Sequence, residues 1–117
     1  MTQRYPIAEG VTVAVAPTDT VLFAPVPLSM KTHLYLAVRN DDAAQLVTAR
    51  IQTGPTSSGP WLDLPNSILS DIAALALGED TFETLGRPWA RGVATSSGSG
   101  GNVTVWAASV IDRGRSW

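Results

Sequence analysis

A single histidine, His33, limits the acid–base and nucleophilic chemistry that this chain of 117 residues could perform. A Ser–His–Asp arrangement would need a serine presented on a sharp turn beside that imidazole. The serine-rich stretch 96–101 lacks the Gly-x-Ser-x-Gly order, and it is followed by neither a Lys-Ser/Thr pair nor a helical pattern. We interpret it as a hairpin loop and His33 as a surface or edge residue. We therefore expect no catalytic residues and no enzyme activity.

Oxygen ligands for a hard cation are present in Asn40-Asp41-Asp42, but without the spacing of a calcium loop. Three such residues between two apolar runs are typical of a turn. The acidic pair of a glycosidase would have to come from the carboxylates of the central region, and no pair is favoured by its spacing. Those carboxylates are Asp63, Asp71, Glu79, Asp80 and Glu83. Because the chain also has no cysteine, we expect no metal site and no cofactor.

Tryptophans are the stronger candidates for function, since their rings either fill a core or anchor a contact. Trp106 lies in the most apolar segment and is expected in or just beneath the core. Trp89, beside Pro88, could be buried or exposed. Trp61 follows the Gly/Ser/Pro loop 54–60 and is expected to be partly exposed.

Low charge is the main feature of the composition. Only 15% of residues are charged, against about 25% in soluble domains. Part of the surface is therefore expected to be covered by a partner or by a second copy, although a small domain of neutral composition remains the alternative. The net charge of −2 argues against general nucleic-acid binding. Seven of the eight cations are arginine, which suits interfaces, although genomic base composition could produce the same bias.

Membrane insertion and export are not indicated by the sequence. No apolar run approaches the length of about 18 residues that a membrane helix needs. The start, Met1-Thr2-Gln3-Arg4-Tyr5, has no apolar core of signal-peptide length. We expect a protein made in the cytoplasm.

The elements that would position these residues are short alternating apolar runs, each ended by Gly, Pro, Asn or Ser. This pattern is typical of an antiparallel β-sandwich. We predict a single all-β domain over residues 1–117, of jelly-roll or immunoglobulin-like type, with extended N- and C-terminal arms. The eight predicted strands are 11–15, 20–24, 33–39, 45–53, 61–64, 81–85, 89–95 and 102–111.

Three details of this arrangement follow from the pattern. Segments 33–39 and 45–53 are predicted to pair as a hairpin, with Tyr35, Arg39, Arg50 and Gln52 on its outer face. The segment Pro25-Val26-Pro27 is expected at an edge or in an extended connection, because neither proline can donate a ladder hydrogen bond. The last strand is apolar on both faces, so it is expected to be central in the sandwich or packed against a neighbour.

Segment 67–77 is ambiguous. Its apolar residues fit a helical stripe, with Asn66 or Ser67 as N-cap and Gly78 after the last turn. We predict one short helix near 67–77.

The order of strands and loops over residues 33–111 resembles that of small β-sandwich virion proteins of tailed bacteriophages. It runs through Ile51-Gln52-Thr53, Trp61-Leu62-Asp63-Leu64, Leu77-Gly78-Glu79, the segment 89–94 and Asn102-Val103-Thr104-Val105. The family includes capsid decoration or cement proteins and head or tail accessory proteins. The resemblance implies a structural role through repeated protein–protein contacts, a place in the virion and no carried-over functional residue. Sugar-binding sandwiches have a similar order.

Two functions are weighed on these grounds. The first is a phage structural protein that forms homo-oligomers and binds other virion proteins through apolar surface and terminal arms. The second is a carbohydrate-binding module in which Trp61 or Tyr35 stacks on a glycan and Arg39 or Gln52 bonds to it. No nucleic-acid or membrane partner is expected. The predicted partner contacts are Arg4, Tyr5, Val26, Pro27, Leu28, Trp61, Arg113, Arg115 and Trp117.

Overall fold

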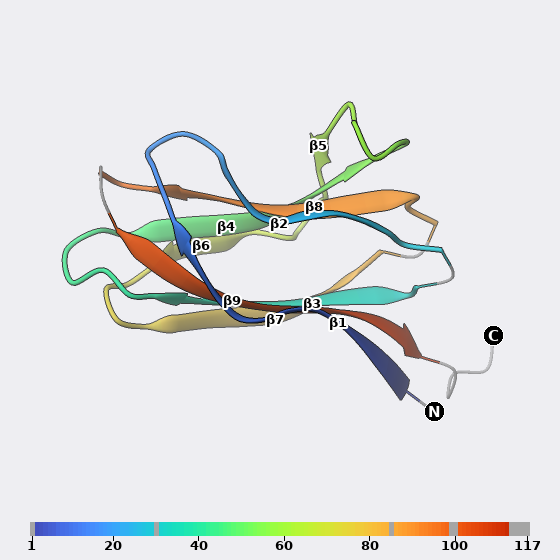
Figure 1. Ribbon diagram of the computed structural model, residues 1–117, viewed down its shortest axis with the longest axis horizontal. Coiled ribbons are helices and arrows are strands. Elements are labelled where there is room, and N and C mark those ends of the chain that lie inside the picture. Colours follow the sequence, from blue (N-terminus) through green and yellow to red (C-terminus); the bar gives the residue numbers. More distant parts are fainter. Residues whose placement is uncertain (1, 30, 85, 99–100, 113–117) are drawn as a thin grey trace.

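Two antiparallel sheets stacked face to face make up the fold of the computed structural model (Figure 1), which describes residues 2–29, 31–84, 86–98 and 101–112. Sheet A has the strand order β1-β9-β3-β7, and sheet B has the order β2-β8-β4-β5, with β6 also paired to β4. Sheet A consists of β1 (Thr2–Ala14), β9 (Asn102–Asp112), β3 (His33–Asn40) and β7 (Leu77–Glu83). Sheet B consists of β2 (Thr20–Pro27), β8 (Trp89–Ser96), β4 (Val47–Gly54), β5 (Leu62–Asp63) and β6 (Leu69–Ile72).

The pairing pattern defines the topology. The first strand pairs with the last, β2 with β8, β3 with β7, and β4 with β5 and β6. This is a long antiparallel hairpin, with its turn after β4, rolled over into a sandwich, which is the jelly-roll arrangement. The prediction of an all-β antiparallel sandwich is confirmed. Within the described residues no helix is long and apolar enough to span a membrane.

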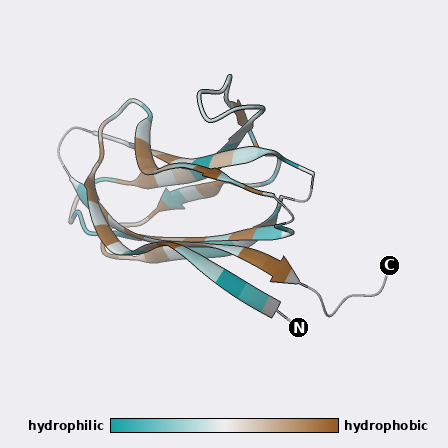
Figure 2. Cartoon of the chain, turned by 45° about the vertical axis from the view of Figure 1, so that its right-hand side comes forward, coloured by the Kyte–Doolittle hydropathy of each residue, from teal (hydrophilic) through white to brown (hydrophobic). Residues whose placement is uncertain are grey.

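The core lies between the two sheets, because alternate residues of each strand point inward. Leu34, Leu36 and Val38 from β3 are fully buried, as the alternation predicts. The other predicted core residues, Val47, Ala49, Ile51, Val103 and Val105, are also fully buried. Figure 2 shows hydrophobic residues concentrated along the strands of both sheets and hydrophilic ones at the start of β1 and in the connections. The last strand is central, as predicted, between β1 and β3.

The predicted helix near 67–77 is wrong: the segment contains β6 and a turn that leads into β7. Ile72 and Leu69 pair with Val47 and Ala49 of β4. The buried Ser67 hydroxyl is 3.2 Å from both the amide nitrogen and the carbonyl oxygen of Ile51. This segment therefore forms hydrogen bonds with the edge of β4. A helix of this length would be only marginally stable by itself, so the strand is favoured.

The predicted hairpin of 33–39 with 45–53 is also wrong. β3 belongs to sheet A and β4 to sheet B, so the connection crosses from one sheet to the other. Asn40 fastens this crossing, because its side-chain amide donates to the carbonyls of Gln45 and Ile72 at 2.6 and 3.0 Å. Residues predicted to share one outer face therefore lie on opposite sides of the sandwich.

The sheet edges differ in regularity. β1 has two register shifts against β9, near Pro6 and near Gly10, whose φ of 75° suits a bulge glycine. β2, which contains Pro25 and Pro27, is an edge strand, one of the two places expected for these prolines, and it also has two register shifts. β7 pairs with β3 through seven consecutive positions without a shift. Its other edge has no strand beside it among the described residues.

Candidate interaction surfaces

The outer face of sheet A carries two cation–aromatic pairs. The guanidinium of Arg4 on β1 lies 4.8 Å from the centre of the Tyr35 ring on β3, and that of Arg39 lies 5.5 Å from the Trp106 ring on β9. Ala37 is opposite Trp106 and Ala108 is opposite Tyr35, so small residues separate the two rings. They leave a shallow hollow of about 460 Å³, lined by both pairs, Ala37 and Leu77. Trp106 therefore belongs to the outer surface, half-buried, and not to the core.

Hydrogen bonds tie this face together. The Tyr35 hydroxyl donates to Glu79 Oε2 on β7 at 2.5 Å. That bond to a carboxylate, followed by partial burial, raises the pKa of Tyr35 above its usual value of 10.0. Arg39 Nε donates to Asp41 at 2.7 Å, and the Thr104 hydroxyl donates to the same carboxylate at 2.6 Å. The Thr104 bond first, and then Arg39, lower the pKa of Asp41.

The outer face of sheet B carries a connected polar network. Arg50 on β4 binds Asp19 at 2.7 Å and Asp63 at 2.9 Å. Gln52 donates to Asp63 and accepts from Arg91 Nε at 2.9 Å. The bond from Gln52, and then that from Arg50, lower the pKa of Asp63, while the bond to Asp19 chiefly raises the pKa of Arg50.

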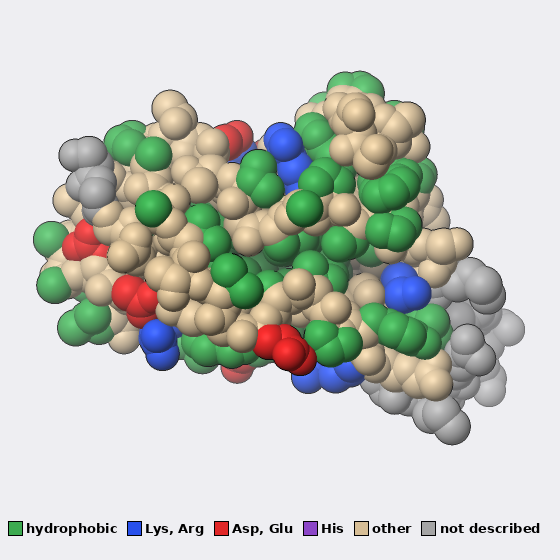
Figure 3. All heavy atoms as spheres, in the orientation of Figure 1, with side chains coloured by type: hydrophobic (Ala, Val, Ile, Leu, Met, Phe, Trp, Pro, Cys, Tyr) green, Lys and Arg blue, Asp and Glu red, His purple; other side chains and the backbone are tan. Residues whose placement is uncertain are grey.

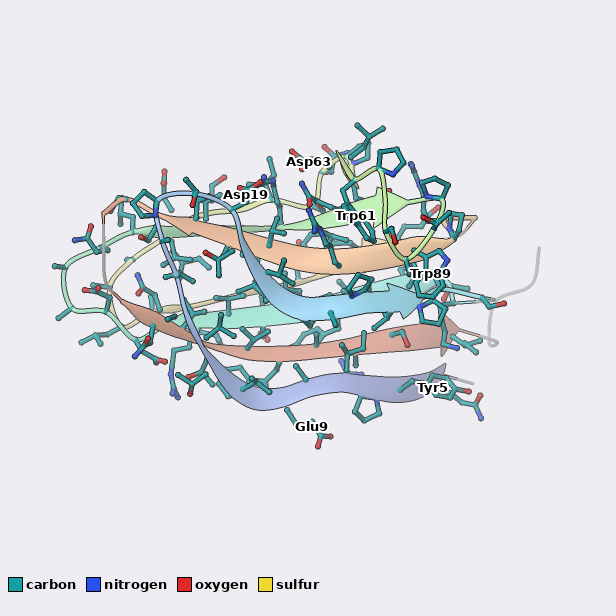
Figure 4. The ribbon with its side chains drawn as sticks, turned by 45° about the horizontal axis from the view of Figure 1, so that its top comes forward. Tyr5, Glu9, Asp19, Trp61, Asp63 and Trp89 are labelled. Atoms are coloured by element: carbon teal, nitrogen blue, oxygen red, sulfur yellow. The ribbon has the colours of Figure 1, made fainter. Side chains whose placement is uncertain are left out.

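The network ends at a corner that holds two tryptophans. The Arg91 guanidinium lies 4.8 Å from the ring of Trp61, which is half-buried, in agreement with the predicted partial exposure. Trp89 pairs with Pro27 on one side and Gly54 on the other. Figure 4 shows Trp61 and Trp89 at the same end of the sandwich, with Asp19 and Asp63 on the outer side of sheet B.

The predicted partner contacts are dispersed over this scaffold. Arg4 and Tyr5 lie on edge strand β1, where Lys31 Nζ is 4.3 Å from the centre of the Tyr5 ring. Pro27 is exposed and Val26 half-buried, whereas Leu28 is 2% exposed and packs in the core. Arg113, Arg115 and Trp117 lie outside the described residues.

Sequence reasoning missed one surface: the edge where β6 and β7 meet, which we name the β6–β7 flank. Ile68, Leu75 and Leu77 are 52%, 69% and 54% exposed there. A hollow of about 520 Å³ lies in the flank, lined by residues 68–70, Ile72, Ala73 and 76–79. Leu75 adopts φ 60°, a conformation that is costly for a leucine. The helical interpretation hid this surface, because it placed Ile68 and Leu75 on the apolar stripe of a helix.

His33 and the turn at Asn40-Asp41-Asp42, considered for catalysis and for metal binding, are engaged in structural contacts. His33 Nδ1 is 2.9 Å from the hydroxyl of Thr32. Asp42 Oδ1 accepts from the amides of Ala44 and Gln45, and the Asn40 side chain accepts from the amide of Asp42, as a turn requires. In the part of the chain that the structure describes, no three His, Cys, Asp or Glu side chains gather into a metal-binding group.

The opposite flank, formed by β1 and β2, also carries few charges. Figure 3 shows hydrophobic side chains along the line between the two sheets and towards the right-hand end of the view, with only scattered charged groups among them. Figure 4 shows Tyr5 and Glu9 projecting from β1 away from the sandwich. The charged groups described on the outer faces are mostly paired within the molecule, whereas several large apolar side chains are exposed to solvent.

Several solved structures share the fold of this sandwich. No family model matches the chain, and no curated protein matches it. A protein of the Bacillus endospore appendages, described as disulfide-linked pili, is 13% identical with a TM-score of 0.56, covering 92% of this chain and 88% of that chain. The SPBc2 prophage-derived protein YomS is 12% identical with a TM-score of 0.56, covering 94% and 93%.

The VP2 protein of an infectious bursal disease virus subviral particle shares the fold as well. It is 9% identical with a TM-score of 0.58; the match covers 94% of this chain but 31% of the VP2 chain. At these identities the likeness is one of fold. The resemblance to virion β-sandwich proteins is thus confirmed at that level.

Proposed function

We propose that this chain is a non-enzymatic structural subunit of a phage particle, which binds copies of itself and neighbouring capsid, head or tail subunits. The observation that carries the proposal is the β6–β7 flank, where three large apolar side chains are more than half exposed and two of them, Ile68 and Leu77, line one hollow. Monomeric proteins rarely leave such groups together in water, and covering them releases about 25 cal/mol per Å² before the costs of association.

The fold neighbours support this proposal by the kinds of protein that they are: a pilus protein, a prophage-derived protein and the protein of a viral particle. The decoration or cement role, and the place in the virion, belong to the proposal. A pilus held by disulfides is not favoured, because this chain has no cysteine.

Light scattering on the purified chain tests the proposal. We expect an oligomer whose mass falls towards that of the monomer in the double variant Leu75→Asp, Leu77→Asp. The control is Leu62→Asp, which makes the same kind of substitution, with one added charge, at a residue 74% exposed on β5, away from the flank. A chain that is monomeric at all concentrations, and that also fails to bind particles, would refute the proposal.

Carbohydrate binding is the second candidate, and the hollow between Tyr35 and Trp106 favours it. Arg4 and Arg39 already stack on these two rings, and Arg91 stacks on Trp61, so a sugar would have to displace a cation or use the opposite ring face. A glycan-array signal lost on Tyr35→Ala or Trp61→Ala would favour this candidate.

A further inference from the structure

Strand β7 combines features that no other described edge strand of more than two residues shows. Its pairing with β3 is free of bulges, and it contains no proline. Strands β1 and β2 carry the prolines and register shifts that discourage pairing with another chain. β7 is therefore the sheet-A edge best suited to receive an added strand.

Charge on this edge selects the kind of strand that it can receive. The segment 69–83 holds Asp71, Glu79, Asp80 and Glu83 and no lysine or arginine. Two copies of β7 placed side by side would bring like charges together, which is unfavourable. A strand that carries arginine or lysine would instead be attracted to these carboxylates.

One segment of the chain has the complementary pattern. Arg113, Arg115 and Trp117 are spaced two residues apart, so an extended strand would carry all three on one face. On β7, Leu77, Glu79, Thr81 and Glu83 occupy one face, opposite outward-facing residues of β3.

We infer that residues 113–117 of a second copy of this chain add to the free edge of β7 as an antiparallel strand; this rests on the proposed assembly of copies. In that register Trp117 lies opposite Leu77, beside the hollow of the β6–β7 flank, and Arg115 lies opposite Glu79. Arg113 lies opposite Thr81, with Glu83 as its diagonal neighbour, within reach of a long side chain.

The same copy cannot supply this strand. Thr104 on β9 pairs with Arg39 on β3, and Arg39 pairs with Leu77 on β7, so the three residues lie level across the sheet. Asp112 lies eight residues past Thr104 along β9. That is about 27 Å along the strand, and the three strand spacings from β9 to the added strand are about 14 Å more across the sheet. The direct distance is thus about 30 Å, whereas five extended residues span at most about 18 Å. Trp117 can reach the position beside Leu77 only from another copy.

Cysteine cross-linking tests the register, since the natural chain contains no cysteine. Full-length Arg113→Cys is mixed with full-length Thr81→Cys under mild oxidation. We expect the mixed disulfide to form several-fold faster than with the control Ser57→Cys, which is an exposed residue of the 54–60 loop. Equal rates for the two partners would overturn the inference.

A charge exchange tests the electrostatics without cysteine. We expect Arg113→Glu, Arg115→Glu to weaken self-association about tenfold, as expected for the loss of two charge pairs. Mixing this variant with Glu79→Arg, Glu83→Arg should restore association, because the charges are then complementary again. A merely structural role of either segment would give no such restoration.

The two failures can be told apart. If the unaltered chain forms oligomers that neither charge change weakens, the inference is wrong and the proposed function stands. If the unaltered chain is monomeric and the mixed disulfide forms no faster than the control, the inference is wrong, and the proposed function is wrong as well if the chain also fails to bind particles.

Discussion

The charged side chains described on the two outer faces mostly interact with other side chains of the same face. The surface left without such intramolecular partners is therefore mainly apolar. Arg4, Arg39 and Arg91 each stack on an aromatic ring, and Arg50 is shared by two aspartates. Such cation–aromatic contacts occur about once per 70–80 residues in proteins, so their number here indicates ordered outer faces. The candidate interaction surface consequently depends on leucines and isoleucine of the β6–β7 flank.

The Tyr35–Glu79 pair gives a prediction at this scale. Glu79→Gln removes the charged acceptor, so the pKa of Tyr35 should fall from its raised value towards about 10. NMR titration of the tyrosine ring carbons measures it. Because the folded-state pKa is raised, the pair contributes stability below about pH 10 and loses that contribution as pH rises through the folded pKa. An unchanged Tyr35 titration in Glu79→Gln would show that this bond does not control the hydroxyl.

At the scale of elements, alternation identified most strands but not their partners. The inward residues of β3 and β4 were predicted, because a two-residue period fixes which side chains share a face. The same period cannot distinguish two strands paired in one sheet from two strands packed across a sandwich, so the predicted hairpin was wrong. The helix was predicted for a similar reason. Apolar residues spaced three and four apart fit one face of a helix, but a strand followed by a turn and another strand can show the same spacing.

Ser67 tests why segment 67–77 is not a helix. Ser67→Ala removes the buried hydroxyl that contacts the Ile51 backbone, and should lower the free energy of unfolding by about 1–2 kcal/mol. Urea denaturation measures the change. Ser70→Ala, at an exposed position of β6, is the matched control and should change stability by less than about 0.5 kcal/mol. Equal effects of the two changes would contradict the structural role of Ser67.

At the scale of the whole molecule, the sequence was sufficient for the sandwich and its core but not for the interaction surface. Leu36 and Val105 follow from local pattern alone. The exposure of Leu75 and Leu77 depends on the path of β6 along β4, which is a non-local pairing. The predicted contacts at Arg4, Tyr5, Pro27 and Trp61 remain predictions, and the cationic segment 113–117 gains a proposed partner in the acidic edge of β7.

The central claim is that the chain is built into a particle, and its most direct test is to locate it there. Particles purified from the source organism would be labelled with gold-conjugated antibody against the chain and imaged by electron microscopy. We predict gold at repeated, fixed positions on the particles, and co-purification of the chain through a density gradient. Particles that are unlabelled and free of the chain, while it stays in the soluble fraction, would contradict the account.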